Sequence, residues 1–331
     1  MPVLTVIMPV YNGEKFIKES IDSVLNQSFS DFKLLVLNDN STDNTAAILE
    51  SYERQDERVS VITKTKNEGP ANLRNEGIEK SKTEFIALLD ADDIAQPSRF
   101  EKQVDFLNKN PDIGVCGTWF TFFCEKKNKT VKHAVTHDEL KVQFLHSCGI
   151  GNPTVMFRKS ALGDLRFEHQ YVPAEDYGLW SQLLARTKFH NLPESLLLYR
   201  WHDSNISQTK VENLRKSERL IKIKQLEHLD ISSNNPDIDY YLNAVSLKRK
   251  QSADSLIKTI KASHKLLELN NTKQYYNPEI FKQHITRTIV RSIRNTKHKD
   301  MSFYRFVKNE SRYFNFMSRL DKVTLLIKSL F

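Results

Sequence analysis

The chain has 331 residues, a formal net charge of +8 and 39% hydrophobic residues, which suffices for one large domain or two ordinary ones with a buried core. No apolar run approaches the ~18 residues of a membrane-spanning helix, and no basic segment followed by an apolar core marks a signal peptide. The three cysteines, Cys116, Cys124 and Cys148, form no C-x-x-C pair, which indicates buried free thiols in a reducing compartment. We therefore expect a cytoplasmic protein.

The charge is distributed unevenly along the chain. Residues 1–210 carry 25 Lys and Arg against 29 Asp and Glu, whereas residues 211–331 carry 24 against 12. A slightly acidic first part and a strongly basic second part indicate two different tasks.

The first ninety residues predict alternating strands and helices. Apolar segments with the length of strands occupy 4–10, 33–37, 59–63 and 84–89. The helical patterns between them begin with an apolar face over 13–27, continue with Ser41 and Thr42 in N-cap position, and end with a segment that starts at Gly69 and Pro70. This alternation predicts an α/β fold, with a mostly parallel sheet flanked by helices.

The pattern is less regular after residue 112. Strands are predicted at 113–123, 152–160 and 194–202, and helices at 137–147 and 173–187. Beyond about residue 207 the chain is basic and helical in pattern, with breaks at the sequences SSNNPD and YYNP.

Polar clusters follow three of the predicted strands, as YNG, NDNSTD and DADD. Ligands of such sheets bind at the carboxyl ends of the strands. The last cluster places Asp90, Asp92 and Asp93 directly after five apolar residues, and carboxylates this close repel one another unless a cation or protons intervene. Read from the residues alone, the cluster is either a solvated turn or a metal site.

Six motifs occur in order in the first 205 residues: VIMPVYNGEKFIKESIDSVLNQSF, VLNDNSTDNT, NEGPANLRNEGIEKS, FIALLDADD, AEDYGLW and YRWH. Together they resemble the inverting family-two glycosyltransferases of the GT-A fold, of the type that assembles bacterial surface glycans. The resemblance implies a catalytic domain at 1–207, with a nucleotide-sugar half at about 1–112 and an acceptor half at about 113–207. The remaining residues, 208–331, form a basic, mainly helical C-terminal region.

The resemblance also implies a divalent cation, Mn²⁺ or Mg²⁺, that stabilises the departing nucleoside diphosphate. Asp93 matches the direct metal ligand. Asp92 would face the ribose or the waters of the metal, and Asp90 would support the sugar or the metal. His202, in YRWH, would complete the metal shell.

The nucleotide-binding residues follow from the same motifs. Asp39 matches an aspartate that accepts the N–H of a uracil-type base, although Asn38 stands where many relatives have an acid, so a UDP-linked donor is favoured. The other residues implied to face the nucleotide are Pro9, Val10, Tyr11, Asn67 and Arg74. Arg74 could pair with a phosphate or with an aspartate of the DADD cluster.

The AED motif implies the catalytic base. Asp176 would take the proton of the acceptor hydroxyl, while Glu175 would orient the acceptor or its loop. The loop at 148–153 would receive the sugar and the acceptor. Leu197 replaces the glutamine of processive relatives, which implies transfer of a single hexosyl or N-acetylhexosaminyl group in polysaccharide, lipopolysaccharide or capsule assembly.

Two alternatives remain open for the whole chain: a basic nucleic-acid-binding protein, although no recognised binding motif is present, and a non-catalytic nucleotide-sugar-binding protein. Two remain open for residues 280–331, where a predicted terminal helix lines up Leu320, Val323, Ile327 and Leu330 beside basic residues. It docks on the inner face of the cytoplasmic membrane, close to a lipid-linked glycan acceptor, or it packs on the catalytic domain or on a second subunit of a homodimer.

Overall fold

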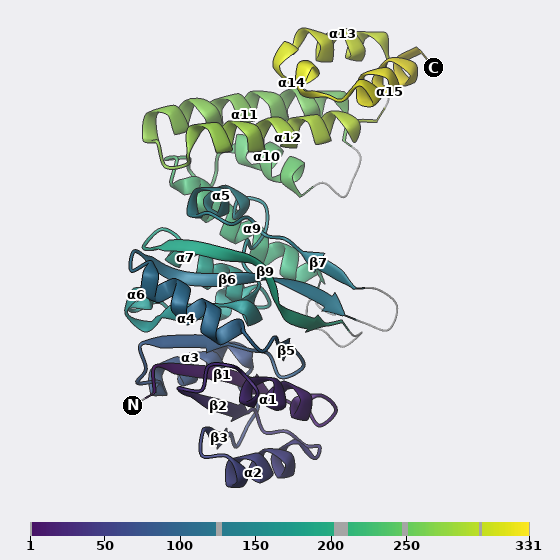
Figure 1. Cartoon of the computed structure of the whole chain (residues 1–331). Helices are drawn as coiled ribbons and strands as arrows, with labels where there is room; N and C mark the ends of the chain where they lie inside the picture. Colours follow the sequence, from purple (N-terminus) through teal and green to yellow (C-terminus); the bar gives the residue numbers. More distant parts are fainter. Residues whose placement is uncertain (1, 124–127, 202–210, 247–250, 298–299, 331) are drawn as a thin grey trace. The chain divides into compact units, whose positions relative to one another are not determined.

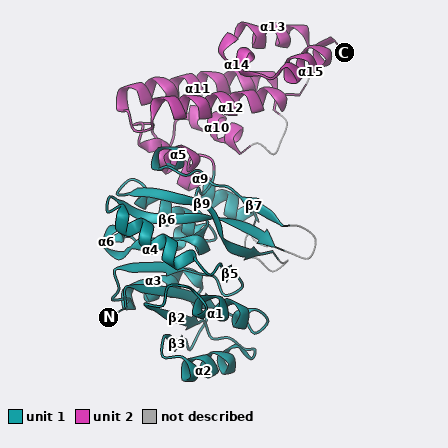
Figure 2. Ribbon diagram, viewed as in Figure 1, with its two compact units in different colours: residues 1–140, 147–218 teal, residues 141–146, 219–331 magenta. Residues whose placement is uncertain are grey.

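The computed structural model describes residues 2–123, 128–201, 211–246, 251–297 and 300–330. The chain divides into two compact units (Figure 2). The first consists of residues 1–140 and 147–218, and the second of residues 141–146 and 219–331.

The first unit is built on a sheet that starts with four parallel strands (Figure 1). They are β1 (Leu4–Val10), β2 (Phe32–Asn38), β3 (Val59–Thr63) and β4 (Phe85–Leu88). Their order is β3-β2-β1-β4, and every residue of β1 and β4 is buried. Such continuous apolar strands are typical of a parallel sheet that is covered on both faces.

Three helices connect these strands: α1 (Ile17–Leu25), α2 (Thr45–Gln55) and α3 (Pro70–Lys80). Pro70 occupies the first turn of α3, as predicted. The predicted N-cap of α2 is wrong, because the helix begins after Asn44. The Ser41 hydroxyl instead accepts the backbone N–H of Asn12, so Ser41 links two loops and does not cap the helix.

The remaining strands make the sheet mixed. β6 (Ile113–Phe123) pairs parallel with β9 (Lys188–Arg200), whereas β8 (Met156–Arg158) runs antiparallel to both β4 and β6. The short strands β5 (Ile94–Ala95) and β7 (Lys129–Val131) add antiparallel pairings with β9 and β6. The predicted α/β fold is confirmed, but its parallel character is confined to the four first strands and the β6–β9 pair.

Further helices and turns complete this part of the chain: α4 (Arg99–Lys109), α5 (His137–Gln143), α6 (Lys159–Leu162), α7 (Glu175–Leu183), and two 3₁₀ turns at Asn152–Thr154 and His169–Tyr171. Cys116 is a buried free thiol, as predicted, and Cys148 is a half-buried one. Cys124 lies outside the described residues.

The described residues from 211 onward are mainly helical. They are α9 (Val211–Glu227), α10 (Pro236–Val245), α11 (Ala253–Lys273), α12 (Pro278–Arg294), α13 (Met301–Asn309), α14 (Ser311–Phe316) and α15 (Arg319–Leu330). The predicted breaks are confirmed, since α10 and α12 each begin with a proline behind an asparagine N-cap. The apolar core of the second unit includes Tyr241, Tyr276, Phe281 and Ile289. No helix among the described residues is both long and apolar enough to cross a membrane.

Candidate active site

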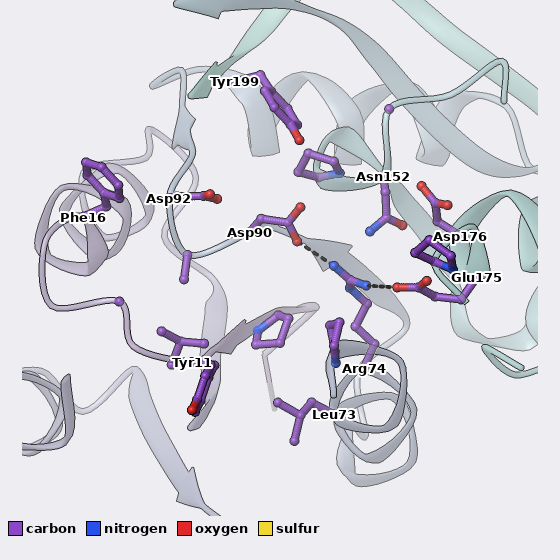
Figure 3. Close-up of a pocket in the computed structure, with 18 of the residues that line it drawn as sticks. Tyr11, Phe16, Leu73, Arg74, Asp90, Asp92, Asn152, Glu175, Asp176 and Tyr199 are labelled. Atoms are coloured by element: carbon purple, nitrogen blue, oxygen red, sulfur yellow. Dashed lines mark hydrogen bonds and ion pairs between the residues drawn. The ribbon is translucent and has the colours of Figure 1, made fainter. Parts of the chain in front are cut away.

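A cavity of about 840 Å³ opens in the first unit, where β1 and β4 end (Figure 3). In the sheet, β2 and β3 lie on one side of β1, whereas β4 lies on its other side. In open α/β sheets, ligands bind at such a switch point in the strand order. The lining residues come from strand ends, from α3, β6 and β9, and from the start of α7: Pro9, Val10, Tyr11, Asn12, Gly13, Lys15, Phe16, Asp39, Pro70, Leu73, Arg74, Asp90, Ala91, Asp92, Phe120, Phe122, His133, Ile150, Gly151, Asn152, Pro153, Pro173, Glu175, Asp176, Tyr199 and Trp201.

Hydrogen bonds tie the loop after β1 to the loop after β2. The backbone N–H of Asn12 donates to Ser41 Oγ at 2.9 Å, and Asn12 Oδ1 accepts from the backbone N–H of Thr42 at 2.8 Å. The backbone N–H of Gly13 donates to Thr45 Oγ1 at 2.8 Å. Asn12 has a φ of 50°, in the left-handed region that asparagine tolerates. These bonds fix one rim of the cavity.

Asp39 lies at this rim beside Pro9, Val10 and Tyr11, and all four line the cavity. The Asp39 side chain is nearly buried, and its two oxygens accept the backbone N–H groups of Glu68 at 2.7 Å and Gly69 at 2.8 Å. A carboxylate offers about four acceptor positions, so these two bonds hold Asp39 in place and leave capacity for a ligand donor.

The structure describes all the residues that we expected to face the nucleotide. Of these, only Asn67 does not line the cavity. Its side chain is exposed, and its amide donates to the Asp39 carbonyl oxygen at 3.4 Å. The structure gives Asn67 a contact with the loop that carries Asp39, and a direct contact of Asn67 with a nucleotide stays a prediction.

The DADD turn sends its carboxylates in different directions. Asp90 and Asp92 line the cavity, and both are drawn there in Figure 3. Asp93 is 1% exposed, and its Oδ1 atom accepts the backbone N–H of Arg200 at 2.9 Å. Burial and the neighbouring Asp92 and Asp90 raise the pKa of Asp93 well above its usual range. Asp93 is not among the residues that line the cavity, and its Oδ2 atom is buried without a hydrogen-bond partner among the described residues, so its assignment as the direct metal ligand stays a prediction.

Asp90 and Asp92 have the chemistry that a divalent cation requires. Mg²⁺ commonly binds through one or two carboxylates together with phosphate oxygens and waters, so two carboxylates beside a nucleotide are a sufficient protein contribution. Within the described ranges, no three or more His, Cys, Asp and Glu side chains lie close enough together to hold a metal ion by themselves. His202, the third expected ligand, lies outside the described residues.

Arg74 connects the acidic turn to α7. Its Nη2 atom lies 2.8 Å from Asp90 Oδ1, and its Nη1 atom lies 3.3 Å from Glu175 Oε1 (Figure 3). The side chain is 8% exposed, and its Cζ atom lies 5.6 Å from the centroid of the Phe167 ring. Burial opposes the charge of Arg74, but the two carboxylates raise the pKa of this guanidinium above its usual value. Of the two partners that the sequence left open, the structure shows the aspartate.

Asp176 stands at the N-terminus of α7, and its carboxylate accepts the backbone N–H of Tyr177 at 2.6 Å. Burial, followed by the charge of Glu175, raises the pKa of Asp176 to about 6. A carboxylate with such a pKa is ionised at neutral pH and is still a useful proton acceptor. Figure 3 shows Asp176 next to Glu175 and Asn152.

Aromatic side chains of β6, of β9 and of the residue that follows β9 also line the cavity. The interpretation of the sequence did not include them. Phe120, Phe122, Tyr199 and Trp201 occupy alternate positions of the sequences FTF and YRW. Alternation in a strand was the available signal, since it places such residues on one face. The loop at 148–153, which the sequence did indicate, contributes Ile150, Gly151, Asn152 and Pro153 to the lining.

Comparisons with known proteins identify the family and the fold. The family model of glycosyl transferase family 2 matches residues 5–166. An uncharacterized glycosyltransferase of Haemophilus influenzae is 33% identical, over 79% of this chain and 84% of its own. The UDP-Glc:alpha-D-GlcNAc-diphosphoundecaprenol beta-1,3-glucosyltransferase WfgD of Escherichia coli is 31% identical, over 65% of this chain and 83% of its own. S. aureus TarS 1–349, solved with UDP-GlcNAc, shares the fold at a TM-score of 0.58 and 18% identity, over 97% of this chain and 88% of the TarS chain.

Proposed function

This chain belongs to glycosyl transferase family 2, and from that premise we propose that it transfers one sugar from a UDP-linked donor to a hydroxyl group of a glycan acceptor, with inversion at the anomeric carbon. One observation carries the proposal: a single cavity brings together Asp39, the carboxylates of Asp90 and Asp92, and Asp176. We assign catalysis to residues 1–207 and a docking role to residues 208–331.

The donor would lie with its base beside Asp39 and the end of β1. Asp39 is held by two backbone amides and can accept a further N–H, which suits a uracil ring. A uridine nucleotide is also named for WfgD and for the TarS complex, and this supports UDP for the present chain. We infer a hexosyl or N-acetylhexosaminyl group as the sugar.

Asp92, with Asp90, would hold Mn²⁺ or Mg²⁺ against the diphosphate. When bound, the cation neutralises the charge that grows on UDP as the sugar departs. The ion pair with Arg74 fixes the orientation of Asp90, and the buried Asp93 holds the turn in place by accepting the backbone N–H of Arg200.

Asp176 would act as the general base. The acceptor O–H bond breaks as its proton passes to the Asp176 carboxylate, and the oxygen forms a bond to the anomeric carbon. The bond between that carbon and the phosphate oxygen breaks, and its electron pair leaves with UDP. Attack from the side opposite the leaving group inverts the configuration. Glu175, bonded to Arg74, holds the start of α7 in place.

A binding experiment tests the donor and metal assignments together. UDP should raise the midpoint of thermal unfolding of the full chain in the presence of Mn²⁺, because a ligand of the native state stabilises it by mass action. A nucleic-acid-binding protein would be stabilised by DNA or RNA in a salt-dependent way and not by UDP. The absence of any shift with UDP or UDP-sugars would contradict the proposed donor.

The acceptor is proposed to be a glycan carried by a lipid diphosphate, as the name of WfgD states for that protein. Catalysis would then occur in the cytoplasm at the membrane surface. The described part of α15 supports a membrane contact, because four apolar side chains stand on one exposed line of this helix. Leu320, Val323, Ile327 and Leu330 are 76%, 52%, 52% and 59% exposed, and the opposite side of α15 buries Leu325.

An anionic lipid surface fits this line of α15 better than a second copy of the chain. Residues 280–331 contain 12 Lys and Arg against three acids, so two copies of this region would repel each other, whereas anionic lipids would attract it. Stable dimers also bury roughly 20–30 residues a side, far more than one short helix face. A basic helix with an exposed apolar line can lie in the lipid interface.

Vesicle sedimentation tests this contact. The full chain should bind vesicles that contain phosphatidylglycerol and not vesicles of phosphatidylcholine, and added salt should weaken the binding. The double variant Val323→Glu, Ile327→Glu should bind at least tenfold more weakly, while the control Asn271→Glu, Thr272→Glu, which adds the same charge at exposed positions of α11, should bind nearly as well as wild type. Equal loss in both variants, or a wild type that forms dimers and ignores lipids, would overturn the membrane contact.

A further inference from the structure

The loop that forms one side of the cavity directly follows a segment that belongs to the other unit. Residues 141–146 are part of the second unit, and the chain returns to the first unit at residue 147. Val142 and Leu145 of this segment are buried in the apolar core of the second unit. Ile150, Gly151 and Asn152 line the cavity only a few residues later. The loop would therefore follow movements of the second unit unless a group in the first unit holds it.

Asn191 of β9 holds the chain on both sides of this segment. Its side-chain Nδ2 atom donates to the Ala134 carbonyl oxygen at 2.7 Å and to the Gly149 carbonyl oxygen at 2.9 Å. Its backbone N–H donates to the Val135 carbonyl oxygen at 3.0 Å. We call these three hydrogen bonds the Asn191 clamp. The clamp ties the start of the loop at 148–153 to the sheet of the first unit.

The sheet is shaped to accommodate the Asn191 clamp. Asn191 is fully buried, and its register partner in β6 is Gly117. A Cβ atom at Gly117 would lie 2.2 Å from Asn191 Oδ1 and 2.5 Å from Ile150 Cγ1, so a glycine is needed at this position. The two accepting carbonyls also fix the orientation of the amide, because a flipped amide would place its oxygen against them.

The other end of the loop has its own support. Thr154 Oγ1 donates to the Gly151 carbonyl oxygen at 2.7 Å. Between the two ends, Asn152 Oδ1 accepts a hydrogen bond from Trp180 Nε1 at 3.2 Å, and Figure 3 shows Asn152 next to Asp176. Loss of the Asn191 clamp would free the start of the loop and shift the cavity lining beside the proposed base.

We propose that Asn191 is a positioning residue for sugar transfer, which holds the loop at 148–153 against the cavity independently of the second unit. This inference rests on the proposed function. Asn191 does not itself line the cavity, so it acts through the loop. The nucleotide rim, with Asp39 and Tyr11, is held by other hydrogen bonds. Loss of the clamp should therefore spare UDP binding and slow the chemical step.

The variant Asn191→Leu tests the clamp, because it nearly keeps the size of the side chain and removes both of its donated hydrogen bonds. The probe is UDP-glucose or UDP-GlcNAc, whichever the wild type hydrolyses faster with Mn²⁺ and water as the acceptor. We expect hydrolysis to fall at least tenfold, since a displacement of about 1 Å can cost on the order of 10²-fold in rate. The UDP affinity, measured by isothermal titration, should stay within twofold of the wild-type value.

Gly117→Ala tests the clamp from the neighbouring strand, because its Cβ atom pushes on Asn191 and on Ile150. It should slow hydrolysis and spare UDP binding as Asn191→Leu does. Gly114→Ala is its matched control in β6, where the added Cβ atom would lie 2.4 Å from Thr187 Oγ1. This control should keep the hydrolysis rate within twofold of wild type. The glycine pair decides the question if Asn191→Leu does not fold.

A second control separates positioning from stability. Asn270 of α11 is also buried, and its side chain makes two hydrogen bonds to the backbone of Tyr276, at 3.0 and 2.9 Å. Asn270→Leu should lower the Tm about as much as Asn191→Leu does, but it should leave hydrolysis unchanged.

Three results would overturn the positioning role of Asn191. They are an equal loss of hydrolysis in Asn270→Leu, an unchanged rate in Gly117→Ala, and a loss of UDP affinity in Asn191→Leu that matches its loss of hydrolysis. Each of them leaves the proposed transferase intact, because the wild type still binds UDP and hydrolyses the UDP-sugar. A wild type that binds no UDP would instead overturn the proposed function.

Discussion

The guanidinium group of Arg74 lies 2.8 Å from the carboxylate of Asp90, and this pair joins the acidic turn after β4 to the rest of the cavity. The other side of the same guanidinium contacts Glu175 at 3.3 Å, at the start of α7. The buried guanidinium group of Arg74 therefore sets the relative positions of the proposed metal-binding turn and of α7, the helix that carries the proposed base, Asp176.

Replacing Arg74 with methionine should destabilise the protein and disrupt the site. The change leaves Asp90 and Glu175 without their shared cation, and removal of one partner of a buried ion pair costs about 3–5 kcal/mol. We expect a loss near the lower limit, because Asp90 is partly exposed, and it can be measured by urea denaturation. Arg186→Met removes an exposed arginine paired with the exposed Asp164 and should change the stability little. Equal effects in the two variants would contradict the bridging role.

The metal assignment predicts different outcomes for two adjacent aspartates. Asp92→Asn should abolish the Mn²⁺-dependent part of UDP binding, because Asp92 lines the cavity. Asp93→Asn should retain most of it, since the amide oxygen can still accept the backbone N–H of Arg200. Isothermal titration with UDP, with and without Mn²⁺, measures both. Loss in Asp93→Asn with full binding in Asp92→Asn would instead support Asp93 as the direct ligand, as the motif implies.

The proposed base predicts the pH dependence of turnover. The pKa of Asp176 is raised to about 6, chiefly by burial, and only the ionised carboxylate can accept a proton. The kcat/KM of wild type for UDP-sugar turnover should therefore rise as the pH increases through about 6 and level off above it. Asp176→Asn should lower the rate on the order of 10²–10⁴-fold and remove this limb of the profile. If kcat/KM of the variant still rises through about pH 6, the rise belongs to the titration of another group.

The same substitution should stabilise the fold. A carboxyl whose pKa rises from 3.8 to about 6 on folding binds its proton more tightly in the native state, so its ionisation above pH 6 disfavours folding. Asp176→Asn should raise the Tm at pH 7.5, and this gain should disappear as the pH falls toward 4. A gain of equal size at both values would point to packing and not to charge.

The sequence alone predicted the four parallel strands to within one residue at each end, because their apolar runs are continuous and bounded by polar turns. It also placed the polar clusters after β1, β2 and β4, which the structure brings to one cavity. Strand direction after residue 112 could not be predicted, since short strands such as β8 carry no signal that distinguishes parallel from antiparallel pairing.

Two features of the site depend on the folded backbone. The backbone N–H of Asp93 donates to the Asp90 carbonyl at 3.2 Å, and this turn directs Asp93 inward, which spacing within DADD does not indicate. The aromatic part of the cavity lining arises because β6 pairs with β9, so that Phe122 meets Tyr199 from a distant part of the chain. A motif identifies residues near a site, but the pairing of strands decides which of them face it.

The stereochemistry of turnover tests the central claim most directly. Wild-type protein is supplied with UDP-GlcNAc, an α-linked donor, and Mn²⁺ in the absence of an acceptor, so that water attacks the anomeric carbon and UDP leaves. Proton NMR records the anomeric signal of the GlcNAc that is released, before mutarotation. Single displacement assisted by Asp176 predicts β-GlcNAc as the first product, with slower formation in Asp176→Asn. First release of α-GlcNAc would show retention of configuration and would contradict the account.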